Sequence, residues 1–173
     1  MSESVINHIL LFIVLVAAQA VVFNNLILFN SAVALVFLFM LVEMPATLSV
    51  NVTMIVGFML GLAIDIFQDT PGLNAMTCTI TAFIRKPIFH LYVPRDEDLT
   101  DRRLSIRTLG KAVYLKYMLT FVIIYCAIYF SIEAFSYFDI RRLGLRIALS
   151  SLYTFVVLYA IDSLTNGRSA KRL

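Results

Sequence analysis

The chain has very little positive charge in its first half. No lysine or arginine occurs before Arg85, and all 14 basic residues of the 173-residue chain lie from there onward. A signal peptide begins with a basic stretch, so residues 5–23 indicate an uncleaved first helix, although Ala18-Gln-Ala20 resembles a cleavage site. The chain also has no long basic helix and no basic–aromatic alternation, and therefore no sign of a nucleic-acid-binding surface.

Residues that bind metals or form disulfides are equally scarce. The two cysteines, Cys78 and Cys126, both lie in apolar runs. A disulfide framework or zinc site needs more cysteines at closer spacing, and a buried cysteine usually behaves as a small hydrophobic residue. His8 and His90 are far apart and have no partner at a metal-ligand spacing. We therefore expect no metal and no cofactor.

What the chain has in excess is apolar residues, at 61% of the total. A soluble domain of this size is closer to half apolar. The excess is concentrated in long runs, which predict helices that cross a lipid bilayer. Too few residues lie outside these runs to form a second domain, so the sequence predicts one all-α integral membrane domain over residues 1–173.

The apolar runs predict about six transmembrane helices. Five runs are long enough to cross a bilayer core of ~30 Å at 1.5 Å per residue, and they cover about residues 5–23, 26–44, 50–67, 112–135 and 143–164.

The fourth span is short, because Arg85-Lys86-Pro87 interrupts the apolar runs 73–84 and 88–93. We expect this span to end near Arg85, with the remainder in the interface. In the alternative, Arg85 and Lys86 reach toward the headgroups. The span count thus lies between five and six.

Basic residues are concentrated in a charged loop, 94–111, and in a tail, 165–173. With six spans, both termini and this loop share one side, and the basic residues near the loop are Arg85, Lys86, Arg95, Arg102, Arg103, Arg107 and Lys111. The opposite side has Arg141, Arg142 and Arg146. The positive-inside rule therefore predicts that the loop, the tail and both termini are cytoplasmic. Anionic lipid headgroups and a cytoskeletal protein are both compatible partners for the loop.

The most informative motif places Gly57, Gly61 and Asp65 four residues apart. On a helix this spacing keeps them near one face, drifting by roughly 40° per step. Glycines on one face allow close helix packing in a bilayer, and an intramembrane acid faces protein or water rather than lipid. The motif predicts a packing or interaction surface, with Asp65 either a buried anchor or a helix-end residue that reaches water.

Asp65 and Asp69 also form an acidic pair, but no third acid or histidine follows nearby. Asp69-Thr-Pro71-Gly72 has the residue types of a tight turn, where aspartate commonly caps the backbone. We therefore predict no catalytic residue and no metal ligand here. Two further acids, Glu133 and Asp162, are predicted to be interfacial because they lie near the ends of spans.

The pattern Gly57-x3-Gly61-Leu62-x2-Asp65, followed by Pro71-Gly72-Leu73-Asn74-Ala75, resembles the MreD family of bacterial rod shape-determining membrane proteins. The layout is similar over the whole chain and the motif over residues 57–75. The resemblance implies a non-enzymatic inner-membrane subunit of the cell-wall elongation machinery. It would bind MreC and act with RodA, its partner transpeptidase and, indirectly, the MreB cytoskeleton.

The resemblance further implies a fold similar to the substrate-binding subunits of energy-coupling-factor transporters. The carried-over positions would serve helix packing or partner binding, not catalysis, and they are Gly57, Gly61, Asp65, Pro71 and Gly72. On this interpretation a partner helix packs on the glycine face, and Gly61→Leu disrupts that contact. Whether the protein forms a homodimer is left open.

Two other functions compete with this one. A vitamin-type binding subunit of a transporter would share the implied fold, but the Ala-x3-Ala pattern of such subunits is missing from the first helix. Ala17, Ala18 and Ala20 are instead followed four residues later by Val21, Val22 and Asn24. A membrane lipid enzyme could use Asp65 and Asp69, but it would need further acids or a histidine.

Overall fold

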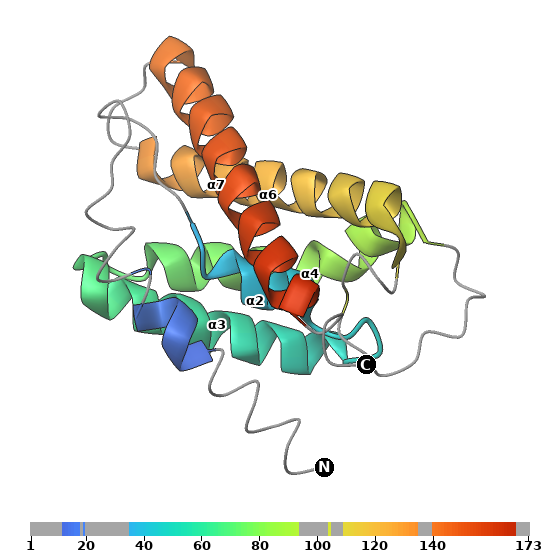
Figure 1. The fold of residues 1–173 in the computed structure, drawn as a ribbon. Helices are drawn as coiled ribbons and strands as arrows, with labels where there is room; N and C mark the ends of the chain where they lie inside the picture. Colours follow the sequence, from blue (N-terminus) through green and yellow to red (C-terminus); the bar gives the residue numbers. More distant parts are fainter. Residues whose placement is uncertain are drawn as a thin grey trace.

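The computed structural model describes residues 12–17, 19, 35–93, 104, 109–134 and 140–168. Within these residues every regular element is a helix and no strand occurs, in agreement with the predicted all-α class (Figure 1). Residues 12–17 are helical, and the other helices are α2 (Leu38–Glu43), α3 (Val50–Gln68), α4 (Leu73–His90), α6 (Lys111–Glu133) and α7 (Ile140–Arg168).

Three helices are long and apolar enough to cross a membrane. They are α3 with 19 residues, α6 with 23 residues, and the 22 residues Leu143–Leu164 of α7. These segments correspond closely to the predicted spans 50–67, 112–135 and 143–164. The chain therefore carries transmembrane helices, while most of the predicted first span and residues 26–34 of the second lie outside the described residues.

The predicted span over residues 26–44 is not one continuous helix. Residues 35–37 form a turn, and α2 begins only at Leu38. The backbone N–H of Leu35 donates to Thr154 Oγ1 at 3.1 Å, and that of Val36 donates to Gln19 Oε1 at 2.8 Å. Non-helical backbone is tolerated at membrane depth only where other groups satisfy it, and here every residue from 35 to 44 is buried in protein.

The Arg85-Lys86-Pro87 segment does not end the fourth helix, whereas the expectation that the membrane span ends near Arg85 stays a prediction. Helix α4 continues through Arg85, Lys86 and Pro87 to His90. Pro87 lies in the last turn, so the helix loses one hydrogen bond and ends shortly afterwards. Arg85 needs no interfacial position because it is buried against protein, with 2% of its surface exposed.

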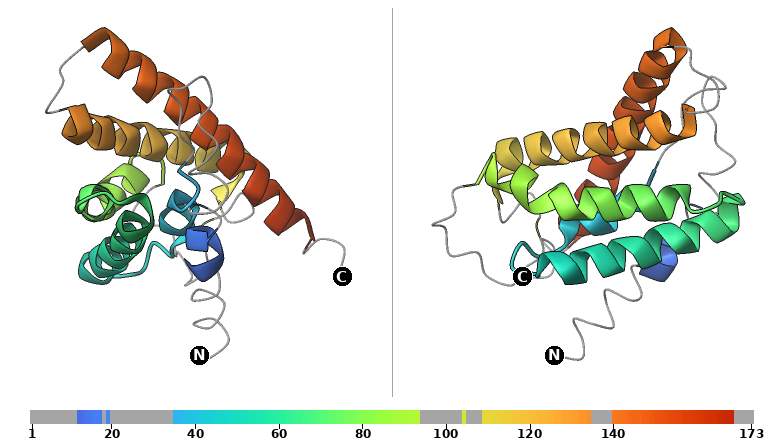
Figure 2. Two further views of the ribbon diagram at one scale, coloured as in Figure 1. Left: turned by 90° about the vertical axis from the view of Figure 1, so that its left-hand side faces the viewer. Right: turned by 180° about the vertical axis from the view of Figure 1, so that it is seen from behind.

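The helices form a layered bundle around α2. Helices α3 and α4 make an antiparallel hairpin, α6 runs antiparallel beside α4, and α7 packs on α6 at a steep incline (Figures 1 and 2). Helix α4 accompanies α3 along its length but is not among the three helices that are long and apolar enough to cross a membrane.

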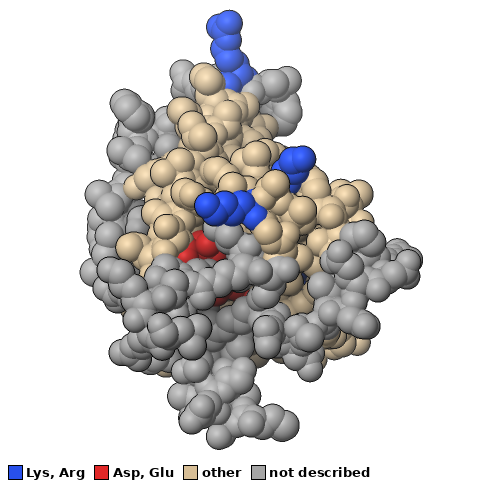
Figure 3. All heavy atoms as spheres, turned by 45° about the vertical axis from the view of Figure 1, so that its right-hand side comes forward, with Lys and Arg blue, Asp and Glu red and all other residues tan. Residues whose placement is uncertain are grey.

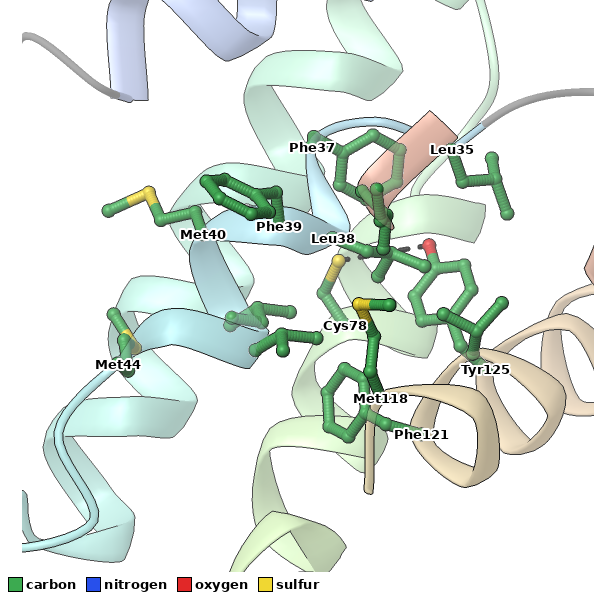
Figure 4. Close-up of a cluster of buried hydrophobic side chains, with 14 of the residues drawn as sticks. Leu35, Phe37, Leu38, Phe39, Met40, Met44, Cys78, Met118, Phe121 and Tyr125 are labelled. Carbon is green, nitrogen blue, oxygen red and sulfur yellow. Dashed lines mark hydrogen bonds between the residues drawn. The ribbon is translucent and has the colours of Figure 1, made fainter. Parts of the chain in front are cut away.

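Apolar side chains fill the centre of the bundle around α2. The rings of Phe37 and Tyr125 meet edge to face, with centroids 5.9 Å apart. Side chains from α4 and α6 close the cluster: Cys78 comes from α4, and Met118, Phe121 and Tyr125 come from α6 (Figure 4). The other labelled residues belong to α2 and the residues next to it, and they are Leu35, Phe37, Leu38, Phe39, Met40 and Met44. The short helix α2 is therefore an internal element of the bundle.

The outward faces of the spanning helices are also apolar. The exposed residues recur every three or four positions, which is one face of a helix. On α3 they are Val52, Ile55, Met59, Leu62 and Ile66, and on α7 they are Leu145, Leu149, Leu152 and Val156. Exposed faces of this kind are suited to contact with lipid.

Candidate functional site

Asp65 lies in the last turn of α3 and is buried, with 4% of its surface exposed. Its Oδ1 accepts hydrogen bonds from the backbone N–H of Asn74 at 2.9 Å, from Asn74 Nδ2 at 2.9 Å and from Thr70 Oγ1 at 2.5 Å. Its Oδ2 accepts the backbone N–H of Ala75 at 2.8 Å. The carboxylate is thus fully engaged within the chain.

These bonds make Asp65 the cap of the helix that follows. Asn74 and Ala75 belong to the first turn of α4, whose N–H groups have no partner within the helix. The residue at the N-cap is Gly72, which has no side chain to accept them. The carboxylate of Asp65 supplies the acceptor from the neighbouring helix, and its negative charge interacts favourably with the positive end of the α4 dipole.

This arrangement explains why an acid is tolerated in an apolar helix. An unpaired buried carboxylate is very unfavourable, whereas hydrogen bonds to its charged form offset the loss of water. The structure therefore places Asp65 as a buried anchor and not as a residue that reaches water. Its partners are all in the same chain.

The network extends from Asp65 into α6. Asn74 Nδ2 also donates to Gln68 Oε1 at 2.9 Å, and the hydroxyl of Tyr125 donates to Asn74 Oδ1 at 3.3 Å. The Tyr125 hydroxyl lies 3.8 Å from the sulfur of Cys78. One hydrogen-bonded group therefore ties the α3–α4 hairpin to α6.

The turn between α3 and α4 has the geometry that its residues predict. Asp69 adopts a left-handed conformation with φ 53° and caps α3 through its N–H bond to the Asp65 carbonyl. Gly72 has φ 80°, which favours glycine. Asp69 and Pro71 are exposed. Since Asp65 is bonded to α4, the two acids do not form an open metal-binding pair, and the described residues contain no group of three metal ligands.

Gly57 and Gly61 face α4 of the same chain. A Cβ atom on Gly61 would lie 2.5 Å from the Cα of Ala75, and one on Gly57 would lie 3.1 Å from the Cβ of Ala82. The first distance is impossible without movement of backbone. The glycine face is therefore filled by α4, and the expectation that a partner helix packs on it does not hold.

A second polar cluster lies at the opposite end of the bundle, and we call it the inner cluster. It contains Glu43 at the end of α2, Arg85 in α4 and Asp162 in α7, all buried. The guanidinium of Arg85 donates to the backbone carbonyls of Met44 and Pro45. A cation at the carboxyl end of a helix satisfies its last carbonyls, so Arg85 caps α2.

Two tyrosines of α6 complete the inner cluster. The hydroxyl of Tyr117 lies in the electrostatic field of Arg85, and that of Tyr114 lies in the field of Asp162 and Glu43. The ring of Tyr117 also packs edge to face on Phe89, with centroids 5.6 Å apart. Helices α2, α4, α6 and α7 therefore all contribute to the cluster.

Sequence reasoning did not find the inner cluster. It placed Arg85 in a basic loop and Asp162 at an interface, but Arg85 lies within α4 and Asp162 is completely buried. One available signal was a series of residues at steps of four on one face of α7, namely Ser150, Thr154, Leu158 and Asp162. Three of these four residues are polar, in a helix that is otherwise largely apolar. All four of these residues are buried in the structure.

The other residues that the sequence singled out lie at the two ends of the bundle or outside the described residues. Lys86 lies in α4, and Lys111 is the first residue of α6. Glu133 is exposed and forms an ion pair with Arg146 at 3.2 Å. The predicted tail is helical as far as Arg168. Outside the described residues lie Arg95, Arg102, Arg103 and Arg107, together with residues 169–173.

Comparison of the chain with models of protein families, with curated proteins and with solved structures finds no match.

Proposed function

We propose that this chain is a non-enzymatic membrane subunit that binds other membrane proteins, with the role of MreD in bacterial cell-wall elongation. It would bind MreC in the inner membrane and connect it to RodA and its partner transpeptidase, with both termini in the cytoplasm. The proposal rests on the resemblance over residues 57–75 and on the part that those residues play in the fold.

The observation that carries the proposal is the bonding of Asp65. An intramembrane acid is a candidate functional site by default. Here both oxygens of that acid cap α4, so the acid serves the α3–α4 hairpin. Gly61 serves the same hairpin by allowing close approach to Ala75. The motif thus builds a scaffold, which suits an interaction subunit better than a lipid enzyme that uses Asp65 and Asp69.

With the glycine face occupied, partner contacts move to the exposed faces. Helix α3 presents Ile55 and Met59, and α7 presents Leu145 and Leu149, all on apolar outer surfaces. In a bilayer these faces contact lipid and not water, and they can exchange that lipid contact for packing against the transmembrane helix of another protein.

The experiment is crosslinking in the native membrane. A photo-crosslinking residue is placed singly at Met59 or Leu149, which are exposed, and at Leu60, which is completely buried, as a control. We expect MreC to be captured from at least one exposed position and not from Leu60. Depletion of the chain should make rod-shaped cells round.

Recovery of the ATPase module of a vitamin transporter, with cell shape unchanged on depletion, would reject the proposal. A vitamin retained by the purified protein would point the same way. That result would assign the chain to the class of small-molecule-binding transporter subunits.

A further inference from the structure

Lys116 is exposed on the lipid-facing side of α6. Lys116, Leu119 and Ile123 follow one another at three- and four-residue steps, and all three are exposed. They therefore share one outer face of a helix that is long and apolar enough to cross a membrane. An ammonium group is very unfavourable in hydrocarbon, so the charge must reach the headgroup layer.

The direction of α6 shortens the distance between the ammonium group of Lys116 and the headgroup layer. In an α-helix the Cα–Cβ bonds tilt toward the N-terminus, so the side chain of Lys116 extends toward the start of α6. Lys111 is the first residue of α6 and lies ~7.5 Å away along the axis, at 1.5 Å per residue. The flexible stem of Lys116 spans most of this distance. Both ammonium groups can therefore meet the same headgroup layer.

No acidic side chain neutralises these lysines within the described residues. Neither Lys111 nor Lys116 forms an ion pair there, and the acids at this end of the bundle, Glu43 and Asp162, are buried. Figure 3 shows basic side chains projecting from a largely uncharged surface, with acidic atoms visible in a recess. The exposed charge at this end of the described structure is therefore positive.

Helix α4, which packs beside α6, also presents exposed apolar side chains. The hydroxyls of Tyr92 and Thr120 are 2.7 Å apart, which places the end of α4 against the first half of α6. Leu91, at the end of α4, is 73% exposed, and Phe83 is exposed on the same helix. Exposed basic and exposed apolar residues on adjoining helices suit the boundary between headgroups and acyl chains.

We propose that Lys111 and Lys116 bind the phosphodiester headgroups of anionic phospholipids. Lys111 and Lys116 are five residues apart, which is roughly 140° around the helix, so each ammonium group meets its own headgroup in that layer, and a headgroup with net negative charge is favoured at each. A zwitterionic headgroup carries the same phosphate together with its own cation and would be held less firmly. The proposal is independent of the partner role above, because it concerns the chain and its lipid alone.

The test is native mass spectrometry of the purified full chain in neutral detergent, titrated with phosphatidylglycerol or phosphatidylcholine. We expect wild type to retain more phosphatidylglycerol, with salt weakening its binding. Each lysine contributes ~1 kcal/mol near a membrane surface, so Lys111→Gln with Lys116→Gln should weaken the binding of each headgroup by roughly fivefold. Retention of phosphatidylcholine should not change.

Two variants provide the controls. Lys111→Arg with Lys116→Arg keeps both charges and should bind phosphatidylglycerol as wild type does. Arg141→Gln removes an exposed basic residue that already interacts with another group of the chain, and it should weaken binding less than the lysine substitutions do. Equal retention of the two lipids by wild type, or an equal loss in Arg141→Gln, would overturn the proposal. The salt dependence of wild type tests it even if the double glutamine variant fails to fold.

Discussion

The carboxylate of Asp65 and the backbone N–H of Ala75 lie 2.8 Å apart, although ten positions separate the two residues in the chain. This bond joins the last turn of α3 to the first turn of α4. It makes the acid of the glycine motif a structural residue of the hairpin, since the first turn of α4 depends on that acceptor.

Replacing Asp65 with asparagine should destabilise the protein by about 1–3 kcal/mol. The amide loses the negative charge at the start of α4, and its NH₂ group cannot accept a backbone N–H. The measurement is the thermal unfolding midpoint of the purified protein in detergent. Asp69→Asn is the matched control, because Asp69 is exposed on the turn, and it should shift the midpoint much less. Equal shifts would contradict the capping role.

A side chain at Gly61 should be poorly tolerated. Its Cβ would lie 2.5 Å from the Cα of Ala75, so Gly61→Ala must push α3 and α4 apart. Overpacking of this kind typically costs about 1–3 kcal/mol. Gly144→Ala is the control, because a Cβ there meets nothing within 4 Å and alanine favours helix. We expect a lower unfolding midpoint for the first variant and an equal or higher one for the second.

Arg85 and Lys86 are adjacent basic residues with opposite surroundings. Arg85→Met leaves the carbonyls of Met44 and Pro45 without their guanidinium donor, and an unsatisfied buried polar group costs about 1–3 kcal/mol. Lys86 is only partly buried, so Lys86→Met should have little effect on the unfolding midpoint. A larger effect at Lys86 would show that Arg85 does not hold α2.

Both cysteines should be protected from thiol reagents. Cys78 and Cys126 are free and buried between helices. We expect a membrane-permeant maleimide to leave the native protein unlabelled and to label two thiols after denaturation. Ser131→Cys places a thiol at an exposed position near the end of α6 and should react at once. Rapid labelling of the wild-type protein would contradict the packing around α4 and α6.

Much of the fold follows from local sequence. The apolar runs predicted α3, α6 and the spanning part of α7 because helices of about 20 residues are what a bilayer requires. The turn at Asp69–Gly72 followed from its residue types, and the four-residue spacing of Gly57, Gly61 and Asp65 gave them one face. Local sequence could not say what would meet that face, and α4 of the same chain meets it.

The break before α2 and the burial of Arg85 were decided by tertiary structure. The N–H of Leu35 is satisfied by Thr154, which is 119 positions away, and Arg85 finds its acceptors 40 and 41 positions earlier. Hydrophobicity predicts a continuous helix and an interfacial arginine when each segment is considered alone. Distant side chains can satisfy a broken backbone and a buried charge, and only the folded arrangement of the helices brings those side chains close enough.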